Sequence, residues 1–260
     1  MKIASFNVNS INTRLTRALD WAKREKPDAV VLQEIKCVDE KFPAEAFEDL
    51  GYNVAVHGQK TYNGVALLSK FPIDDVKKGL PGDKDDDQAR YIEALICPSH
   101  HAPVRLCGLY LPNGNPAPGP KYDYKLAWMK RLKRRAKALL ADEEAFILAG
   151  DFNVIPQEED AHNPKAWLGD ALFLPESRAA FREIVNLGLT DAILQVKGPG
   201  AHFTFWDYQG GAWEKDNGIR IDHMLLSPQA ADRLKDAGID RKERGKEKPS
   251  DHVPVWVEID

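Results

Sequence analysis

Two polar residues follow a buried strand near the middle of the chain. The uncharged apolar run 145–149 is followed by Asp151 and Asn153, which are two positions apart. Because residues i and i+2 of an extended segment point to the same side, a carboxylate and an amide are expected to stand together at this strand end. The first apolar segment also ends in an amide, Asn7, within a Phe-Asn-Val tripeptide that both places share. Since α/β proteins bind ligands at strand ends, the pattern predicts a polar site built from at least two of them.

Other segments with strand-like sequence also end in, or contain, polar groups. These are Glu34 after the second apolar segment, Tyr110 at the end of a β-rich run, Asp222 within the run 219–226, and Asp251 and His252 before the last segment. A carboxylate inside an apolar strand needs a partner. Histidine is a natural one for Asp222, because an Asp–His pair orients the imidazole and favours its charged form.

The types of these side chains favour hydrolysis of a phosphate ester. Carboxylates without cysteine ligands suit a hard cation such as Mg²⁺ or Mn²⁺. Zinc is disfavoured because no His-x-x-x-His or Cys-His cluster of ligand spacing occurs. The sequence also lacks a Gly-x-Ser-x-Gly elbow, a Walker loop and a dinucleotide fingerprint. Carboxylate, amide and imidazole groups around a hard cation supply the charge neutralisation, oriented water and donors that phosphate ester hydrolysis requires.

The elements that must position these groups alternate irregularly along the chain. Strands are predicted at 2–8, 29–33, 53–57, 65–69, 91–97, 104–111, 145–149, 202–206, 219–226 and 253–259. Helices are predicted at 14–26 with Asn12 as N-cap, at 125–140 and at 177–187. Hairpins mixed with crossover helices favour a mixed-sheet α/β sandwich over an all-parallel sheet. Long loops are predicted at 80–90, 113–120 and 157–174, and without an evident linker we expect one domain over residues 1–260.

Composition limits the class of protein. The 260 residues carry 36 Lys and Arg against 40 Asp and Glu, a formal charge of −4, which argues against binding to nucleic acid by bulk charge alone. Three scattered cysteines without a Cys-x-x-Cys pair favour a reducing compartment. The first apolar segment is too short for a signal peptide, and no run approaches the ~20 apolar residues of a membrane span. We therefore expect a soluble, cytoplasmic protein.

Five short motifs resemble those of a known superfamily and occur in its order. They are Ser5-Phe6-Asn7-Val8, Leu32-Gln33-Glu34-Ile35-Lys36, Gly150-Asp151-Phe152-Asn153, Arg220-Ile221-Asp222 and Ser250-Asp251-His252. The chain resembles the endonuclease/exonuclease/phosphatase superfamily, and more narrowly its exonuclease III-type apurinic/apyrimidinic endonucleases. The segments 64–66, 109–113 and 204–208 also match that branch, so the resemblance covers nearly the whole chain.

This resemblance implies a fold and a set of roles. The expected fold is a deoxyribonuclease-like, four-layer α/β sandwich, with two mixed β-sheets face to face, helices outside and the active site at one edge. The resemblance implies that Glu34 is the principal Mg²⁺ ligand, with Asn7 and Asp251 beside it. It implies that Asp151 orients or deprotonates the attacking water, and that Asn153 helps to hold this water and the phosphate. It also implies that His252, paired with Asp222, contacts a phosphate oxygen, and that Tyr110 donates to the phosphate or the leaving group.

The resemblance also implies a substrate. In the abasic-site enzymes a small apolar pocket accepts a flipped-out sugar without a base, and such a pocket excludes a normal base. The matching positions here are Phe205, Ile219 and Ile221, with Trp206 adjacent, although Trp206 fits a place in the core equally well. Asn113, from the segment 109–113, is a further substrate-binding candidate.

The implied activity is Mg²⁺-dependent DNA repair, with Mn²⁺ as a possible substitute. The expected reaction is hydrolysis of the phosphodiester 5′ to abasic sites, with 3′–5′ exodeoxyribonuclease and 3′-phosphatase activity. The expected partner is double-stranded DNA with abasic sites or blocked 3′ ends, bound by a monomer without membrane association. Two alternatives stay open: a phosphodiesterase or phosphatase of the same superfamily for a non-DNA phosphate ester, and a catalytically silent nucleic-acid-binding module.

Overall fold

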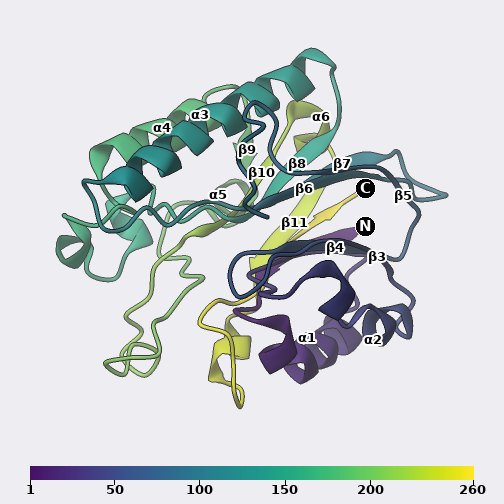
Figure 1. Cartoon of the computed structure of the whole chain (residues 1–260), viewed down its shortest axis with the longest axis horizontal. Coiled ribbons are helices and arrows are strands. Elements are labelled where there is room, and N and C mark those ends of the chain that lie inside the picture. The colour runs from purple at the N-terminus through teal and green to yellow at the C-terminus, as the bar shows by residue number, and fades with distance from the viewer.

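Two six-stranded sheets pack face to face in the computed structural model, which describes all residues from 1 to 260. Helices α3 (Pro120–Ala141) and α4 (Pro175–Val185) cover one sheet, and α1 (Ile11–Glu25) and α2 (Ala44–Glu48) cover the other (Figure 1). The order of layers is therefore helix, sheet, sheet, helix. The predicted four-layer α/β sandwich is confirmed.

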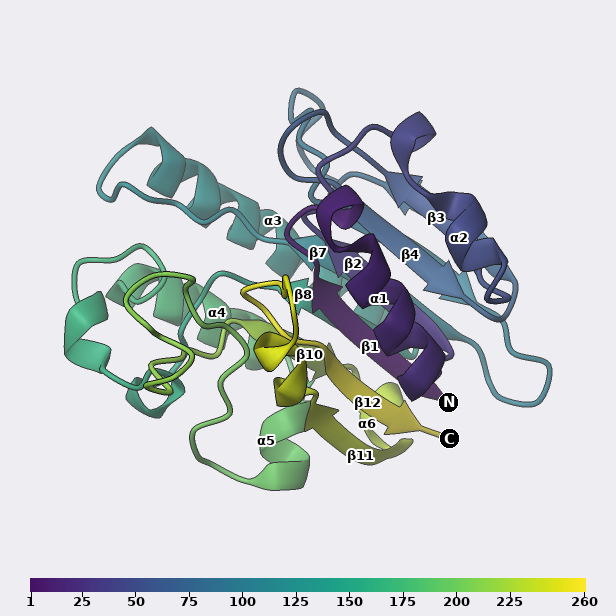
Figure 2. The same cartoon turned by 90° about the horizontal axis from the view of Figure 1, so that it is seen from below.

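The first sheet has the strand order β11-β12-β1-β2-β4-β3. Its strands are β1 (Lys2–Asn7), β2 (Ala29–Gln33), β3 (Asn53–His57), β4 (Val65–Ser69), β11 (Leu234–Ile239) and β12 (Val255–Ile259). Strands β1 and β2 are parallel, because α1 crosses over between them, and the other pairs are antiparallel. Figure 2 shows α1 lying along β1.

The second sheet has the order β5-β6-β7-β8-β10-β9. Its strands are β5 (Ile73–Lys78), β6 (Tyr91–Ile96), β7 (Val104–Tyr110), β8 (Phe146–Asp151), β9 (Thr190–Asp191) and β10 (Asp222–Leu226). It also contains one parallel pair, β7 and β8, which α3 connects. The predicted hairpin is confirmed as the antiparallel pair β6 and β7. Each sheet thus has two neighbouring central strands whose carboxyl ends meet at one edge.

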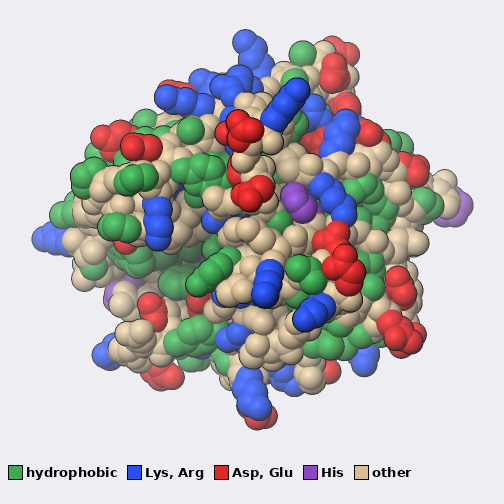
Figure 3. Space-filling view, viewed as in Figure 1, with side chains coloured by type: hydrophobic (Ala, Val, Ile, Leu, Met, Phe, Trp, Pro, Cys, Tyr) green, Lys and Arg blue, Asp and Glu red, His purple; other side chains and the backbone are tan.

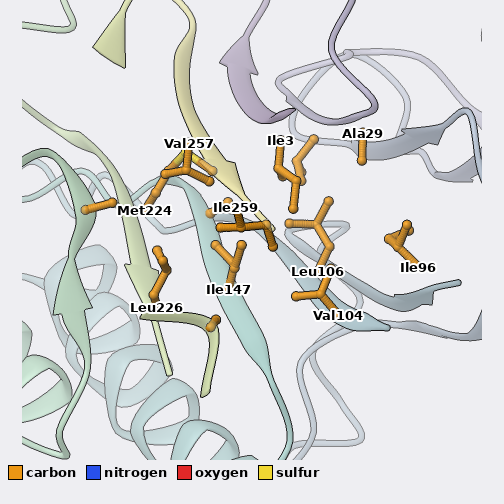
Figure 4. Packing of buried hydrophobic residues seen from close by; sticks show 14 of the residues in the cluster. Ile3, Ala29, Ile96, Val104, Leu106, Ile147, Met224, Leu226, Val257 and Ile259 are labelled. Carbon is orange, nitrogen blue, oxygen red and sulfur yellow. The ribbon is translucent and has the colours of Figure 1, made fainter. Parts of the chain in front are cut away.

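A shared apolar core joins the sheets. A cluster of 21 buried hydrophobic residues lies between them, where Ile3 and Val257 of the first sheet approach Leu106 and Ile147 of the second (Figure 4). Separate clusters lie under α3 with α4 and under α1. Removal of this apolar surface from water is the main force that holds the layers together.

The shorter elements complete the chain. They are α5 (Ala192–Lys197), α6 (Pro228–Ala231) and four 3₁₀ turns, Asp39–Lys41, Glu158–Asp160, Pro164–Trp167 and Arg241–Gly245. None of the helices combines the length and the apolar composition that crossing a bilayer requires. Lys and Arg side chains are interspersed with Asp and Glu on the face in Figure 3, in agreement with the balanced composition.

Several predicted boundaries are wrong. Helix α1 starts at Ile11, so Asn12 lies inside it, and the N-cap position belongs to Ser10, which makes no side-chain cap bond. The predicted strand 202–206 is absent apart from isolated bridges of Phe205, and the strand predicted at 219–226 starts only at Asp222. Both segments have β-rich sequence, but their backbones bond to each other and to residues of other loops, such as Asp160 and Asp251, rather than to a full strand. A β-rich local sequence therefore cannot distinguish a strand within a sheet from a loop of this kind.

Three strands have no prediction at all. Strand β5 has five exposed residues and lies at a sheet edge, so its sequence lacks an apolar face. Strand β9 is only two residues long, and β11 contains an irregularity in its register. Edge strands of this kind depend on their neighbours for their structure rather than on their own hydrophobic pattern.

Candidate active site

The predicted polar residues converge at the edge where the two sheets meet. The first sheet supplies Asn7 at the end of β1, Glu34 directly after β2 and His252 before β12, and the second supplies Tyr110, Asp151 and Asp222 from β7, β8 and β10. In the second sheet Asp151 is paired with Tyr110 on one side and with Asp222 on the other. Strand register therefore fixes three of these side chains in one row.

Asn7 connects the two sheets within the site. Its Nδ2 donates to Glu34 Oε1 at 2.9 Å and to Asp151 Oδ2 at 3.0 Å. Glu34 has a left-handed backbone, with φ of 51°, which turns its carboxylate towards these groups. Its second oxygen lies 2.9 Å from Lys36 Nζ. Burial opposes ionisation of Glu34, but Lys36 and Asn7 together hold its pKa below the ordinary value.

Asp151 and Asn153 form a tight turn rather than an extended pair. Asn153 has a φ of 47°, and its backbone N–H donates to Asp151 Oδ1 at 2.8 Å. Asn153 Nδ2 donates to the carbonyl of Leu111 at 2.9 Å, and its Oδ1 accepts from Asn113 Nδ2 at 3.3 Å. The Asp151 carboxylate thus contacts the backbone of Asn153, and this turn, not strand periodicity, brings the two residues together. Asn113 joins them from the loop after β7.

His252 and Asp222 make the predicted pair. His252 Nδ1 lies 2.8 Å from Asp222 Oδ2, which also accepts from Thr204 Oγ1 at 2.7 Å. Burial lowers the pKa of His252, but the charges of Asp222 and Asp151 outweigh burial and raise it to about 10. The imidazole therefore keeps its proton at neutral pH, and its Nε2 side faces Asp151 Oδ2 at 3.7 Å.

Asp151 is a buried carboxylate among other carboxylates. Burial raises its pKa to about 7, His252 acts in the opposite direction, and Asp222 and Glu34 raise it further. The Tyr110 hydroxyl is buried in the same field, so its pKa is well above the usual range because of burial and the nearby Glu34 and Asp151. The site thus combines excess negative charge with a carboxylate that can exchange a proton near neutral pH.

This arrangement suits a hard divalent cation. Ligand atoms of Glu34, Asp151 and His252 lie within 4.8 Å of one another. Because His252 is held in its protonated form, the carboxylates are the groups able to bind a cation, and a cation would relieve their mutual repulsion. Asp251 lies to one side, where its Oδ1 accepts from Asn9 Nδ2 at 3.1 Å. Asn9 also accepts from Lys36, so it connects Asp251 with Glu34.

The four apolar candidates divide into two groups. Ile219 and Ile221 belong to a cluster of six buried residues, and the ring of Phe205 lies at its margin, 4.9 Å from the His252 ring centroid. Phe205 and His252 also form a backbone bridge. Trp206 is fully buried in a different cluster, and its indole donates to Asp216. Phe205 is therefore the apolar candidate in direct contact with the polar site, and Trp206 is a core residue.

Comparison with known proteins identifies the family of this chain. A model of the endonuclease/exonuclease/phosphatase family matches residues 4–252. The chain belongs to this family. It is 36% identical to exodeoxyribonuclease III of Haemophilus influenzae over the full length of both chains. A 3′ phosphatase from Neisseria, solved with a product DNA hairpin, has a TM-score of 0.95 at 39% identity, and covers 100% of this chain and 99% of its own.

An AP endonuclease from Archaeoglobus fulgidus has a TM-score of 0.94 at 36% identity, with 100% of this chain and 99% of that chain covered. The family membership and the full-length similarity to exodeoxyribonuclease III confirm the predicted resemblance. They also agree with the two mixed sheets described above, which are arranged as in these relatives.

Sequence reasoning missed four polar residues that support the family's site. Lys36 binds Glu34, Asn9 links Lys36 with Asp251, Thr204 binds Asp222, and the buried Lys125 binds the backbone carbonyl of Asn153. Lys36 and Asn9 lie two residues from Glu34 and Asn7, so their proximity in sequence was an available indication. Thr204 belongs to the matched segment 204–208, but nothing in that segment indicates that it binds Asp222, and no local pattern marks Lys125.

Proposed function

We propose that this protein is a Mg²⁺-dependent DNA repair nuclease that hydrolyses the phosphodiester 5′ to abasic sites, with 3′–5′ exodeoxyribonuclease and 3′-phosphatase activity. The single observation that carries the proposal is the buried Asp151 carboxylate, within 3.7 Å of protonated His252 and bonded through Asn7 to Glu34. A base (Asp151), a positively charged donor (His252) and a carboxylate able to bind a cation (Glu34) therefore lie close together. Metal-assisted phosphodiester hydrolysis uses all three.

Each side chain has a role in this proposal. Glu34, with Asn7 and Asp251 nearby, would hold Mg²⁺, which would supply neutralisation of charge on the phosphate. Asp151 orients and deprotonates the attacking water, and Asn153 with Asn113 holds the phosphate. His252, kept charged by Asp222, donates to a phosphate oxygen, and Tyr110 donates to the phosphate or the leaving group. The raised pKa of Asp151, about 7, suits a base that works near neutral pH.

The identity of the substrate rests on two supports. The relatives named above are a DNA exonuclease, a 3′ phosphatase with bound DNA and an AP endonuclease. The apolar side chains of Phe205, Ile219 and Ile221 adjoin the polar site and suit a sugar that has lost its base. We propose that the protein acts as a single-domain monomer on double-stranded DNA, in the cytoplasm, where its three unpaired cysteines would stay reduced.

A cleavage assay tests the proposal. The substrates are a labelled duplex with one abasic analogue, the matched undamaged duplex and a duplex with a 3′-phosphate end. With Mg²⁺ we expect a nick 5′ to the abasic site and phosphate release from the blocked end, and with EDTA we expect neither. Absence of both reactions with Mg²⁺ would overturn the proposal. Release of phosphate from inositol phosphates without DNA cleavage would favour a small-molecule phosphatase instead.

A further inference from the structure

The buried side chain of Lys125 has no role in the reaction proposed above. Lys125, in the second turn of α3, is fully buried, whereas Lys130 on the same helix is exposed. Burial lowers the pKa of Lys125 to about 7, although Asp151 and Asp170 partly oppose this effect. A buried ammonium group is costly unless its donors are used. Its position therefore needs a structural or functional reason.

The ammonium group binds two loops at once. Lys125 Nζ donates to the backbone carbonyl of Asn113 at 3.0 Å and to that of Asn153. Asn113 follows β7 and Asn153 follows β8, so one side chain joins the ends of the parallel strand pair. The carboxamides of the same two asparagines bond to each other at 3.3 Å, and the backbone N–H of Asn153 donates to Asp151 of the polar site at 2.8 Å. Lys125 thus fixes the backbones from which both amides project.

The loop after β7 is fitted closely to this lysine. Gly114 has a φ of 94°, and a Cβ added to it would lie 2.7 Å from Lys125 Cδ. The loop can lie on the aliphatic part of Lys125 because residue 114 has no side chain. On the far side, Asn115 donates to Asp170 at 3.0 Å and accepts from the backbone N–H of Ala171 at 3.0 Å. The loop is therefore held from two directions.

We propose that Lys125 is a positioning residue for the nuclease reaction, which holds the amides of Asn113 and Asn153 at the spacing that the reacting phosphate requires. This inference rests on the proposed function. Lys125 does not itself touch substrate, because it is buried behind the two loops. Its removal should loosen one amide relative to the other, and a misplacement of about 1 Å in an active site can lower a rate by about 10²-fold.

The first test compares Lys125→Met with Lys130→Met, a matched control that removes an exposed ammonium from the same helix. For Lys125→Met we expect kcat on the abasic duplex to fall by about 10–100-fold, while KM and the Kd for DNA in EDTA change by less than about threefold. Lys130→Met should match the wild type. A folded Lys125→Met protein with unchanged kcat, or with equal losses of kcat and DNA affinity, would overturn the inference.

A double variant tests whether Lys125 acts through Asn113. If it does, Asn113→Ala should cost less activity in the Lys125→Met background than in the wild type, whereas independent roles would give multiplying losses and contradict the proposal. If Lys125→Met does not fold, Gly114→Ala keeps the buried ammonium but pushes the loop away from it. That variant should also lose kcat more than affinity, and full activity would overturn the inference. Absence of cleavage by the wild type would instead disprove the proposed function.

Discussion

Two clusters of buried charge in this molecule are built in opposite ways. In the second sheet, away from the strand ends of the site, fully buried Glu93 is bound by Arg135 and the Tyr91 hydroxyl, and Arg105 lies 3.6 Å away. Burial opposes its ionisation, but these partners hold the pKa of Glu93 below its usual value. At the site, the equally buried Asp151 lies near two other carboxylates, and its pKa is raised.

The difference separates structural charge from functional charge. Each oxygen of Glu93 has a cationic or hydroxyl donor, so its cluster is complete without a ligand. The Asp151 cluster has the protonated imidazole and Lys36 for the three carboxylates of Glu34, Asp151 and Asp222, so its charge is balanced only by an added cation or by a proton. Imperfect charge balance costs stability and provides reactivity. Four predictions test this contrast.

The largest effect should come from Asp151→Asn. The change keeps the shape but removes the base, so we expect kcat to fall by about 10²–10⁴-fold. DNA affinity in EDTA should stay within about threefold, and the free energy of unfolding should be unchanged or higher, because a strained charge is removed. Asp123→Asn, an exposed aspartate on α3, is the control. Comparable losses of stability and activity would mean that Asp151 is structural.

Glu93→Gln should give the reverse pattern. Removal of one partner from a buried ionic cluster typically costs about 3–5 kcal/mol, here because Arg135 has no other counter-ion, whereas Arg105 keeps Asp75 and Glu144. We expect a loss of this size in urea unfolding, with kcat and KM on the abasic duplex little changed at a temperature where the protein is folded. A Glu93→Gln variant with the same free energy of unfolding as the wild type would show that the Glu93 cluster contributes less to stability than its burial indicates.

Sequence patterns predict the charged residues of the active site, but they do not predict those of the Glu93 cluster. The strand ends at Asn7, Glu34 and Asp151 are local features, and Asp222 was recognised as a carboxylate in an apolar strand. The same argument applies to Glu93, which is a buried carboxylate in β6. The argument alone cannot say whether the partner is a histidine or an arginine, because the partner comes from a distant element.

Two further buried cations also have partners that the sequence alone does not predict. Lys125 was placed in the predicted helix 125–140, but nothing in that helix indicates that this lysine, and not Lys130, points inward. Arg220 lies inside a recognised motif, yet its ion pairs with Asp160 at 2.6 Å and Asp191 at 2.7 Å depend on a loop and on β9, and β9 was not predicted. Tertiary contacts decide these cases, and single-sequence patterns do not contain them.

The pH dependence of the free energy of unfolding should reveal the contribution of the Asp222–His252 pair. The pKa of His252 rises from 6.5 to about 10 on folding, so its stabilising contribution is complete below pH 6.5 and is lost as pH rises towards 10. Asp222→Asn removes the partner, so the wild type should be more stable by on the order of 1–3 kcal/mol at pH 6, with a gap that narrows towards pH 10. Urea unfolding in EDTA measures this, and a constant gap would show that the pair does not titrate as described.

The most direct test of the central claim, that the Asp151 cluster is completed by a cation, is the effect of Mg²⁺ on unfolding. A cation that binds only the folded state should raise the free energy of unfolding of the wild type by about 1.4 kcal/mol at tenfold excess over its Kd, and by about 2.7 kcal/mol at hundredfold excess. Glu34→Gln should lose this response, and Glu258→Gln, which removes an exposed carboxylate, should keep it. The same unfolding curve for the wild type in Mg²⁺ and in EDTA, or an undiminished response of Glu34→Gln, would contradict the account.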